Sequence, residues 1–178
     1  MFFIKQSNQA RTAGPTGNGQ AFLSQYIKVS RAAKALPQTT TQQLFRVHGG
    51  RVLVRFLIGE VTTVIEGTDP VMKISVSALS SASALVGTAY DIASTLDISS
   101  DEVGTLYSVE GDGTAIISGN QVAGSVEAFG TGWIQSQGQI YMTTGASKTG
   151  AIKWDLYYQP LDPGAYVVAV DAATAAIT

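Results

Sequence analysis

The sequence predicts an all-β fold, either a sandwich or a jelly-roll-like barrel, preceded by an extended N-terminal arm. Nineteen glycines in 178 residues indicate many turns and therefore many short strands rather than long helices. From residue 42 onwards, short runs of alternating apolar and polar residues recur between glycine-containing turns, as in sandwiches and barrels. The length suits one well-buried domain. We therefore predict an N-terminal arm in residues 1–40 and one β-sandwich domain in residues 41–178.

The predicted arm has little apolar material of its own. Residues 13–19 hold three glycines and a proline, a composition typical of a loop. Residues 20–36 favour a short helix with an apolar face between residues 22 and 27, which Pro37 would end. We interpret this segment as an arm that becomes ordered on a partner.

The first predicted strands form a compact hairpin. Residues 44–47 and 51–58 flank the turn sequence His48-Gly49-Gly50, a pattern that favours a tight connection between paired strands. The second of these strands is expected to have one face made of alternate residues, namely Val52, Val54, Phe56 and Ile58.

The remaining strands are short, and the clearest lies near the end of the chain. There Ile152, Trp154, Leu156 and Tyr158 alternate with more polar residues, as expected of a half-buried strand. One interior helix is predicted at residues 88–96. The other predicted strands are residues 61–65, 72–77, 106–109, 114–117, 122–129, 139–143 and 166–170.

The charges are divided along the chain. The first 59 residues hold eight basic residues and no acidic ones, a formal charge of +8. The other 119 hold three lysines and thirteen carboxylates, so 3 − 13 = −10 and the total is −2. Such a split indicates that an acidic partner meets the N-terminal third. The predicted partner-binding residues of the arm are Lys5, Arg11, Lys28, Arg31 and Lys34. The hairpin arginines, predicted to face carboxylates of the same or a neighbouring subunit at a subunit interface, are Arg46, Arg51 and Arg55.

The sequence lacks the residues of several common catalytic and metal sites. Without cysteine it has no disulfide or thiolate site. Its single histidine, His48, is interpreted as a polar turn residue, which excludes His-Cys zinc sites and catalytic triads built on another histidine. The acidic residues at 97–102 and 110–113 lack the spacing of a calcium loop, and the second run is typical of a turn. We expect no catalytic residue, no metal and no cofactor.

Other binding classes are also disfavoured. The glycine-rich residues 14–19 lack the Lys-Ser/Thr ending of a phosphate loop, and no segment resembles a signal peptide or a membrane span. Nucleic acid is disfavoured because no dense basic cluster with interleaved aromatic residues is present. For sugar stacking, Trp154 and Tyr158 are expected in the core, which leaves Trp133 as the candidate.

Three strings resemble small structural proteins of tailed bacteriophages: LPQTTTQQLFRVHGGRVLV (residues 36–54), LIGEVTT (57–63) and GAIKWDLYYQPLDPGAYV (150–167). The likeness covers about residues 36–67 and 103–168, but neither the first 35 residues nor the middle of the chain. It implies a β-rich, oligomeric virion component, of a kind that often forms trimers in decoration or cement roles. Such decoration proteins grip the capsid lattice with an extended terminal arm.

We therefore expect a non-enzymatic bacteriophage virion structural protein, located in the virion and assembled in the host bacterial cytoplasm. The expected role is that of a capsid decoration or cement protein. A homotrimer would bridge capsomers through the N-terminal arm, with the major capsid protein or other virion proteins as partners. One alternative is a tail, collar or spike component that binds a host receptor or glycan. Another is a glycan depolymerase, although the chain has no evident acid/base pair of carboxylates.

Overall fold

The computed structural model describes residues 26–67, 70–79, 85–93, 95–109, 117–120, 132–146 and 148–170. Within these residues the regular structure consists of β-strands and contains no helix, so the all-β prediction is confirmed. The strands are β1 (Ile27–Ala35), β2 (Thr41–His48), β3 (Val52–Thr63), β4 (Val71–Leu79), β5 (Leu85–Asp91), β6 (Leu96–Asp97), β7 (Leu106–Val109), β8 (Ile117–Asn120), β9 (Trp133–Gln135), β10 (Gly138–Thr144), β11 (Ala151–Pro160) and β12 (Tyr166–Ala169).

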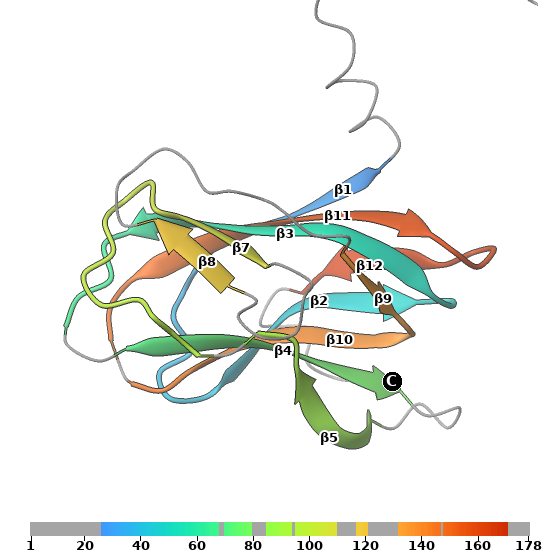
Figure 1. Cartoon of the computed structure of the whole chain (residues 1–178), viewed down its shortest axis with the longest axis horizontal. Helices are drawn as coiled ribbons and strands as arrows, with labels where there is room; N and C mark the ends of the chain where they lie inside the picture. Colours follow the sequence, from blue (N-terminus) through green and yellow to red (C-terminus); the bar gives the residue numbers. More distant parts are fainter. Residues whose placement is uncertain are drawn as a thin grey trace, which may run out of the picture.

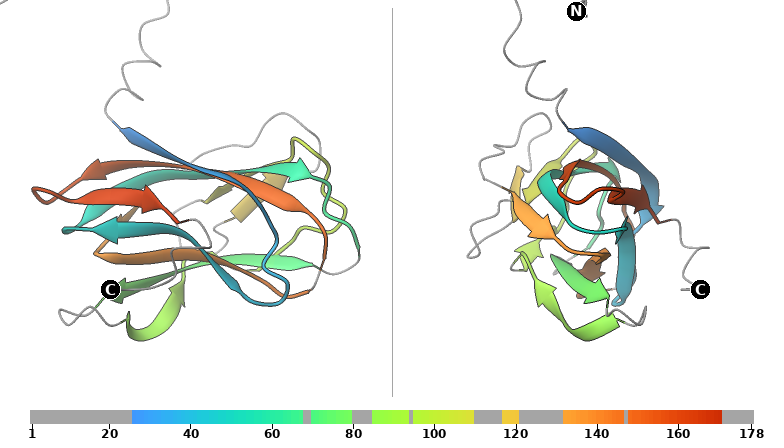
Figure 2. Two further views of the ribbon diagram at one scale, coloured as in Figure 1. Left: turned by 180° about the vertical axis from the view of Figure 1, so that it is seen from behind. Right: turned by 90° about the vertical axis from the view of Figure 1, so that its right-hand side faces the viewer.

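The strands form two antiparallel sheets that pack face to face as a β-sandwich (Figure 1). Sheet I has the order β1-β11-β3-β7-β8, and β9 also pairs with β3. Sheet II has the order β12-β2-β10-β4-β5, and β6 pairs with β4. The end-on view in Figure 2 shows β1 and β12, the edge strands of the two sheets, on the same side of the sandwich.

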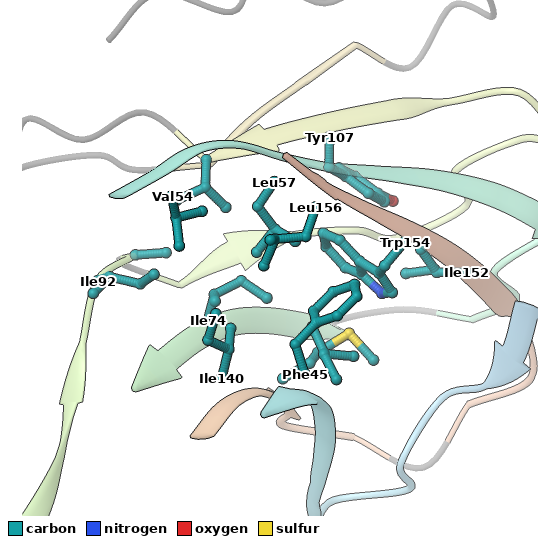
Figure 3. Packing of buried hydrophobic residues seen from close by; sticks show 14 of the residues in the cluster. Phe45, Val54, Leu57, Ile74, Ile92, Tyr107, Ile140, Ile152, Trp154 and Leu156 are labelled. Atoms are coloured by element: carbon teal, nitrogen blue, oxygen red, sulfur yellow. The ribbon is translucent and has the colours of Figure 1, made fainter. Parts of the chain in front are cut away.

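The core lies between the two sheets and follows the alternation of the strands. Along β11 the even-numbered residues from Ile152 to Tyr158 are buried, whereas their neighbours are half-exposed, as predicted. Figure 3 shows Trp154 and Leu156 of sheet I above Phe45 and Ile140 of sheet II. Burial of these apolar side chains is the main contribution to the stability of a fold of this kind.

Gly59 of β3 makes room for the largest buried side chain. It is the cross-strand partner of Trp154, and a Cβ atom at position 59 would lie 2.8 Å from two atoms of the indole ring. The ring of Tyr107 stacks near the same indole, with 6.4 Å between centroids. A side chain at position 59 would therefore displace the indole from the core.

The predicted hairpin at residues 44–58 is wrong, because β2 and β3 belong to different sheets. β2 pairs with β10 and β12, whereas β3 pairs with β11, β7 and β9. The His48-Gly49-Gly50 turn therefore crosses from sheet II to sheet I. The connection between β11 and β12 crosses in the opposite direction, and the two crossing turns lie against each other. A Cβ atom at Gly49, whose φ is +73°, would lie only 2.4 Å from the carbonyl oxygen of Gly164.

The predicted apolar face of β3 is correct only in its first half. Val52 and Val54 are buried, as predicted. After them the buried apolar residues are Leu57 and Val61, whereas Phe56 and Ile58 are half-exposed. The cause is a β-bulge, since the register with β11 shifts between the pairs formed by Val54 and Phe56. An extra residue at a bulge moves all following side chains to the opposite face.

Both predicted helices are also wrong where they fall on described residues. Instead of a helix ending at residue 36, the chain forms β1, which pairs with β11 as an edge strand of sheet I. Instead of a helix at residues 88–96, it forms the end of β5 and the start of β6, both paired with β4. In each case the backbone hydrogen bonds offered by a neighbouring strand outweigh a weak local helix preference.

The predicted arm shares residues with the sandwich. β1 is part of sheet I, and the side chain of Leu36 is 2% exposed within the core. Residues 1–25 of the predicted arm and the predicted strand at residues 122–129 lie outside the described residues.

Candidate binding surfaces

The outer face of sheet I carries two ion pairs between neighbouring strands. Lys28 Nζ of β1 lies 2.9 Å from Asp155 Oδ2 of β11, and Lys153 Nζ of β11 lies 2.7 Å from Glu60 Oε2 of β3. The hydrogen bond to Asp155 raises the pKa of Lys28. Lys28, predicted to bind a partner, is thus paired with a carboxylate of its own chain.

Arg31 and Lys34 also lie on β1. The side chain of Arg31 is 2% exposed, and its Nε donates a hydrogen bond to the backbone oxygen of Val170 at 3.0 Å. Since Val170 follows β12, this bond links the edges of the two sheets. A partner cannot reach a guanidinium in this position, so Arg31 has a structural role rather than a role in partner binding. Lys34 is half-buried. Lys5 and Arg11 lie outside the described residues.

Arg51 clamps the two crossing turns together. Its Nε and Nη2 atoms donate to the two carboxylate oxygens of Asp162 at 2.9 and 2.8 Å, and its backbone N–H donates to Oδ2 at 2.7 Å. These bonds lower the pKa of Asp162 to about 2, the side-chain bond being the largest cause. Arg51 therefore meets a carboxylate of the same subunit, one of the two arrangements that the sequence predicts.

Aromatic and basic side chains interleave on the outer face of sheet I. The ring of Phe56 lies edge-to-face with Tyr26 and with Tyr157, at centroid distances of 6.3 and 6.2 Å. The Nζ atom of Lys28 lies 5.6 Å from the centroid of Tyr157, and the guanidinium of Arg55 lies 5.8 Å from that of Phe56. Sequence reasoning missed this cluster because its members come from strands far apart in the chain. Its rings and cations contact one another, so the cluster mainly stabilises sheet I.

The outer face of sheet II carries hydrogen-bonding side chains in cross-strand rows. The register of the strands places these side chains side by side on the face turned away from the core, although Ser75 and Ser77 are buried there. One row holds Tyr166 and His48, the next Val168, Arg46, Gln139 and Ser77, and the third Gln43, Tyr141, Ser75 and Asp91.

His48 is the last residue of β2 and takes part in an aromatic stack. Its ring lies 5.1 Å from that of Tyr166, with an angle of 14° between the planes, and Tyr166 is 49% exposed. Burial, followed by the positive charge of Arg46, lowers the pKa of His48. The interpretation of His48 as only a turn residue misses this stack, since Tyr166 is distant in sequence.

Several polar atoms on this face lack a hydrogen-bond partner. They are Arg46 Nε, Gln43 Nε2 and Ser77 Oγ, each buried in the isolated chain. Arg46 also forms no ion pair with any described residue. A buried polar group without a partner costs about 1–3 kcal/mol. Sheet II thus carries buried polar atoms that none of the described residues satisfies.

Trp133, the predicted sugar-stacking residue, points inward. It pairs with Val54 between β9 and β3, and its half-buried side chain packs against the core. Its indole is therefore not an open platform for a sugar. The neighbouring residue Ile134 is the exposed one of the pair, at 65%.

The acidic residues form no metal centre in the part of the chain that the structure describes. Among these residues no group of three or more His, Cys, Asp or Glu side chains is placed to hold an ion. Asp101 is buried and accepts a hydrogen bond from the hydroxyl of Tyr107 at 2.5 Å. Burial raises the pKa of Asp101, and it raises that of Tyr107 as well. The acidic run at residues 110–113 lies outside the described residues.

No helix capable of spanning a membrane occurs in the described residues. No protein-family model matches the chain, and no curated protein matches it either. Among solved structures, it is similar to a chain in the structure of infectious bursal disease virus Gx strain, with 8% identity and a TM-score of 0.26. The match covers 81% of this chain and 34% of the viral chain, so the protein spans about a third of that chain's length. This is a weak resemblance between a β-rich domain and a viral protein, too distant to carry an argument about function.

Proposed function

We propose that the chain is a non-enzymatic structural protein of a tailed-bacteriophage virion, most simply a decoration protein that binds the outside of the capsid. In this proposal a homo-oligomer, a trimer, bridges neighbouring capsomers. Many weak contacts with a repeating surface would act together to give tight binding.

The observation that supports the proposal is the position of the phage-like strings in the fold. Residues 36–63 supply β2 and β3, and residues 150–167 supply β11 and the start of β12. In the sandwich β3 pairs with β11 and β2 pairs with β12. The resemblance therefore falls on segments that are distant in the sequence but adjacent in the fold, as expected if it follows a shared domain.

The docking segment in this proposal is residues 1–25, which include Lys5 and Arg11. The other three basic residues of the predicted arm lie on β1. Lys28 is ion-paired, Arg31 is buried and Lys34 is half-buried, so in this proposal residues 1–25 supply the charge for docking. A truncation that tests docking should begin the chain at Tyr26, because a longer deletion would remove β1 from sheet I.

The test is binding of the full chain and of the chain lacking residues 1–25 to phage particles from which the protein is missing. We expect the truncated protein to remain folded and oligomeric but not to sediment with particles. Binding of the full chain should also weaken with salt, because exposed charges are screened over about 8 Å near physiological ionic strength. Normal occupancy by the truncated protein would contradict docking through this segment.

The second candidate is a tail, collar or spike component that binds a receptor or glycan. It is favoured by the unpaired donors and the exposed Tyr166 ring on sheet II. The number of copies per virion, from quantitative mass spectrometry of purified particles, separates the two roles. Hundreds of copies support decoration, whereas a dozen or fewer support a tail, collar or spike position. Release of reducing ends from a polysaccharide by the purified protein would contradict the non-enzymatic proposal.

A further inference from the structure

We propose that the outer face of sheet II, centred on Arg46, His48, Gln139 and Tyr166, is a binding site for a carboxylated glycan. These residues occupy two adjacent cross-strand rows on β12, β2 and β10, so a rigid sheet fixes their spacing. Each of the three features described below matches one part of an acidic sugar.

The first feature is the stacked pair of His48 and Tyr166. His48 supports one side of the Tyr166 ring, at 5.1 Å between centroids, and 49% of Tyr166 is exposed. A supported and exposed aromatic ring offers a flat apolar surface with a polar hydroxyl at its edge. The carbon-bound hydrogens of a pyranose ring form a surface of similar size that can stack on it.

The second feature is the set of polar atoms without partners. Arg46 Nε and Gln43 Nε2 are donors, and Ser77 Oγ can donate or accept. These atoms are enclosed in the isolated chain, so a ligand rich in oxygen acceptors gains from them only when side chains of the face move on binding. The hydroxyl, ring and carboxylate oxygens of an acidic sugar are such acceptors.

The third feature is the charge of the face. The rows around Arg46 and His48 contain no carboxylate. The acidic residue in the third row, Asp91, is already bound to Lys73 at 2.9 Å and to Ser75 at 2.6 Å. Arg46 therefore has no counter-ion among the described residues, and guanidinium groups pair with carboxylates in a two-bond geometry.

The same features favour a carboxylated glycan over a second copy of this chain as the occupant. In a two-fold dimer formed through this face, a residue meets its own copy only near the axis, so an axis close to Arg46 would bring two guanidinium groups together. A carboxylated glycan supplies acceptors and a negative charge without this repulsion.

The inference does not depend on where the protein sits in a virion. It requires only that the outer face of sheet II is accessible in the folded chain. The test therefore uses the purified full-length protein and can succeed or fail separately from the capsid-binding experiment.

The test is titration calorimetry with three soluble acidic polysaccharides as probes: polygalacturonate, hyaluronate and polysialic acid. We expect at least one to bind, and expect its neutral methyl-ester form to bind at least tenfold more weakly. Arg46→Met should weaken binding about tenfold or more, since a hydrogen bond to a charged group is worth at least this much. Tyr166→Ala removes the stacking surface and should weaken binding by up to about tenfold. Tyr166→Phe should retain most of the affinity, because the ring is kept.

Matched controls come from the outer face of sheet I. Tyr157→Ala and Lys153→Met remove the same kinds of group from the opposite side of the sandwich and should leave glycan affinity unchanged. Circular dichroism and thermal unfolding of every variant separate loss of the site from loss of the fold. Binding to none of the three probes overturns the proposal. So does a sedimentation result in which Arg46→Met and Tyr166→Ala dissociate an oligomer, because the face would then be a contact between copies.

Discussion

The two outer faces of the sandwich have similar residue types but use them differently. On sheet I, Lys28 and Lys153 are paired with carboxylates, and Phe56 contacts aromatic rings on both sides. On sheet II, Arg46 has no ion pair among the described residues and buried donors lack acceptors. The two lysines of sheet I find their counter-ions within the chain, as Lys73 of sheet II does with Asp91, whereas Arg46 finds none among the described residues.

This difference changes the meaning of the charge split along the sequence. A formal charge of +8 in the first 59 residues predicts an acidic partner for this part of the chain. In the fold, Lys28 and Arg51 meet Asp155 and Asp162, which lie in the acidic remainder of the same chain. The charge split is therefore partly a consequence of topology. β1 lies next to β11, and the turn before β3 lies next to the turn after β11.

The largest expected effect comes from removing the central ring of the sheet I cluster. Phe56→Ala deletes two edge-to-face contacts, each worth about 0.5–1.5 kcal/mol, and should lower the free energy of unfolding by about 1–3 kcal/mol. Tyr166→Ala on sheet II deletes one stack at the sheet edge and should cost less than about 1 kcal/mol. Urea unfolding monitored by circular dichroism measures both. Equal losses would contradict the view that only the sheet I face is mainly structural.

Two serines on β4 offer a sharper comparison within sheet II. Ser75 Oγ donates to Asp91 at 2.6 Å, whereas Ser77 Oγ is buried without a partner, and both side chains are about as inaccessible. Ser75→Ala should therefore destabilise the protein by about 1 kcal/mol, and Ser77→Ala should be neutral or stabilise it by up to about 1 kcal/mol. The same unfolding experiment provides the measurement. A clear loss of stability in Ser77→Ala would show that its hydroxyl has a partner after all.

The sequence predicts the strands of this fold better than their partners. Alternation identifies β4, β10, β11 and β12 to within two residues at each end, because each has one face against the core. It does not show that β2 and β3 belong to different sheets, since a glycine turn between two strands looks the same in a hairpin and in a crossing. Nor does it show the bulge after Val54, which reverses the faces of β3 and places Phe56 outside.

The candidate site is harder to predict for the same reason. His48 and Tyr166 are 118 positions apart (166 − 48) and meet only because β2 and β12 pair. Trp133 has the residue type of a sugar platform, but its place on β9 turns it toward the core. Residue type suggests a chemistry, whereas strand register decides which side chains share a surface.

A smaller effect is the salt dependence of the free energy of unfolding, which should differ between a charge on sheet I and a charge on sheet II. Asp155→Asn breaks a half-exposed ion pair and should cost about 0.2–1 kcal/mol in low salt. In 1 M salt, where the screening length is about 3 Å, most of this cost should disappear. Arg46→Met, which breaks no ion pair among the described residues, should change stability by the same amount at both salt concentrations. Urea unfolding at the two concentrations provides the measurement, and a salt-dependent effect of Arg46→Met would show that Arg46 has an ionic partner.

The last and smallest effect concerns the bonds between Arg51 and Asp162, which join the two turns that cross between the sheets. The pKa of Asp162 is about 2 in the fold, below its ordinary value of 3.8, because Arg51 hydrogen-bonds the charged form. A lowered pKa stabilises the fold above pH 3.8, and this contribution is lost as the pH falls from 3.8 towards 2. Asp162→Asn should therefore be less stable than the wild type at neutral pH, and the difference should vanish near pH 2. Thermal unfolding between pH 7 and pH 2 measures it, with Glu102→Gln, at an exposed acidic residue, as the control. A difference that persists unchanged at pH 2 would mean that the geometry of the turn, rather than the charge of Asp162, holds the two crossing turns together.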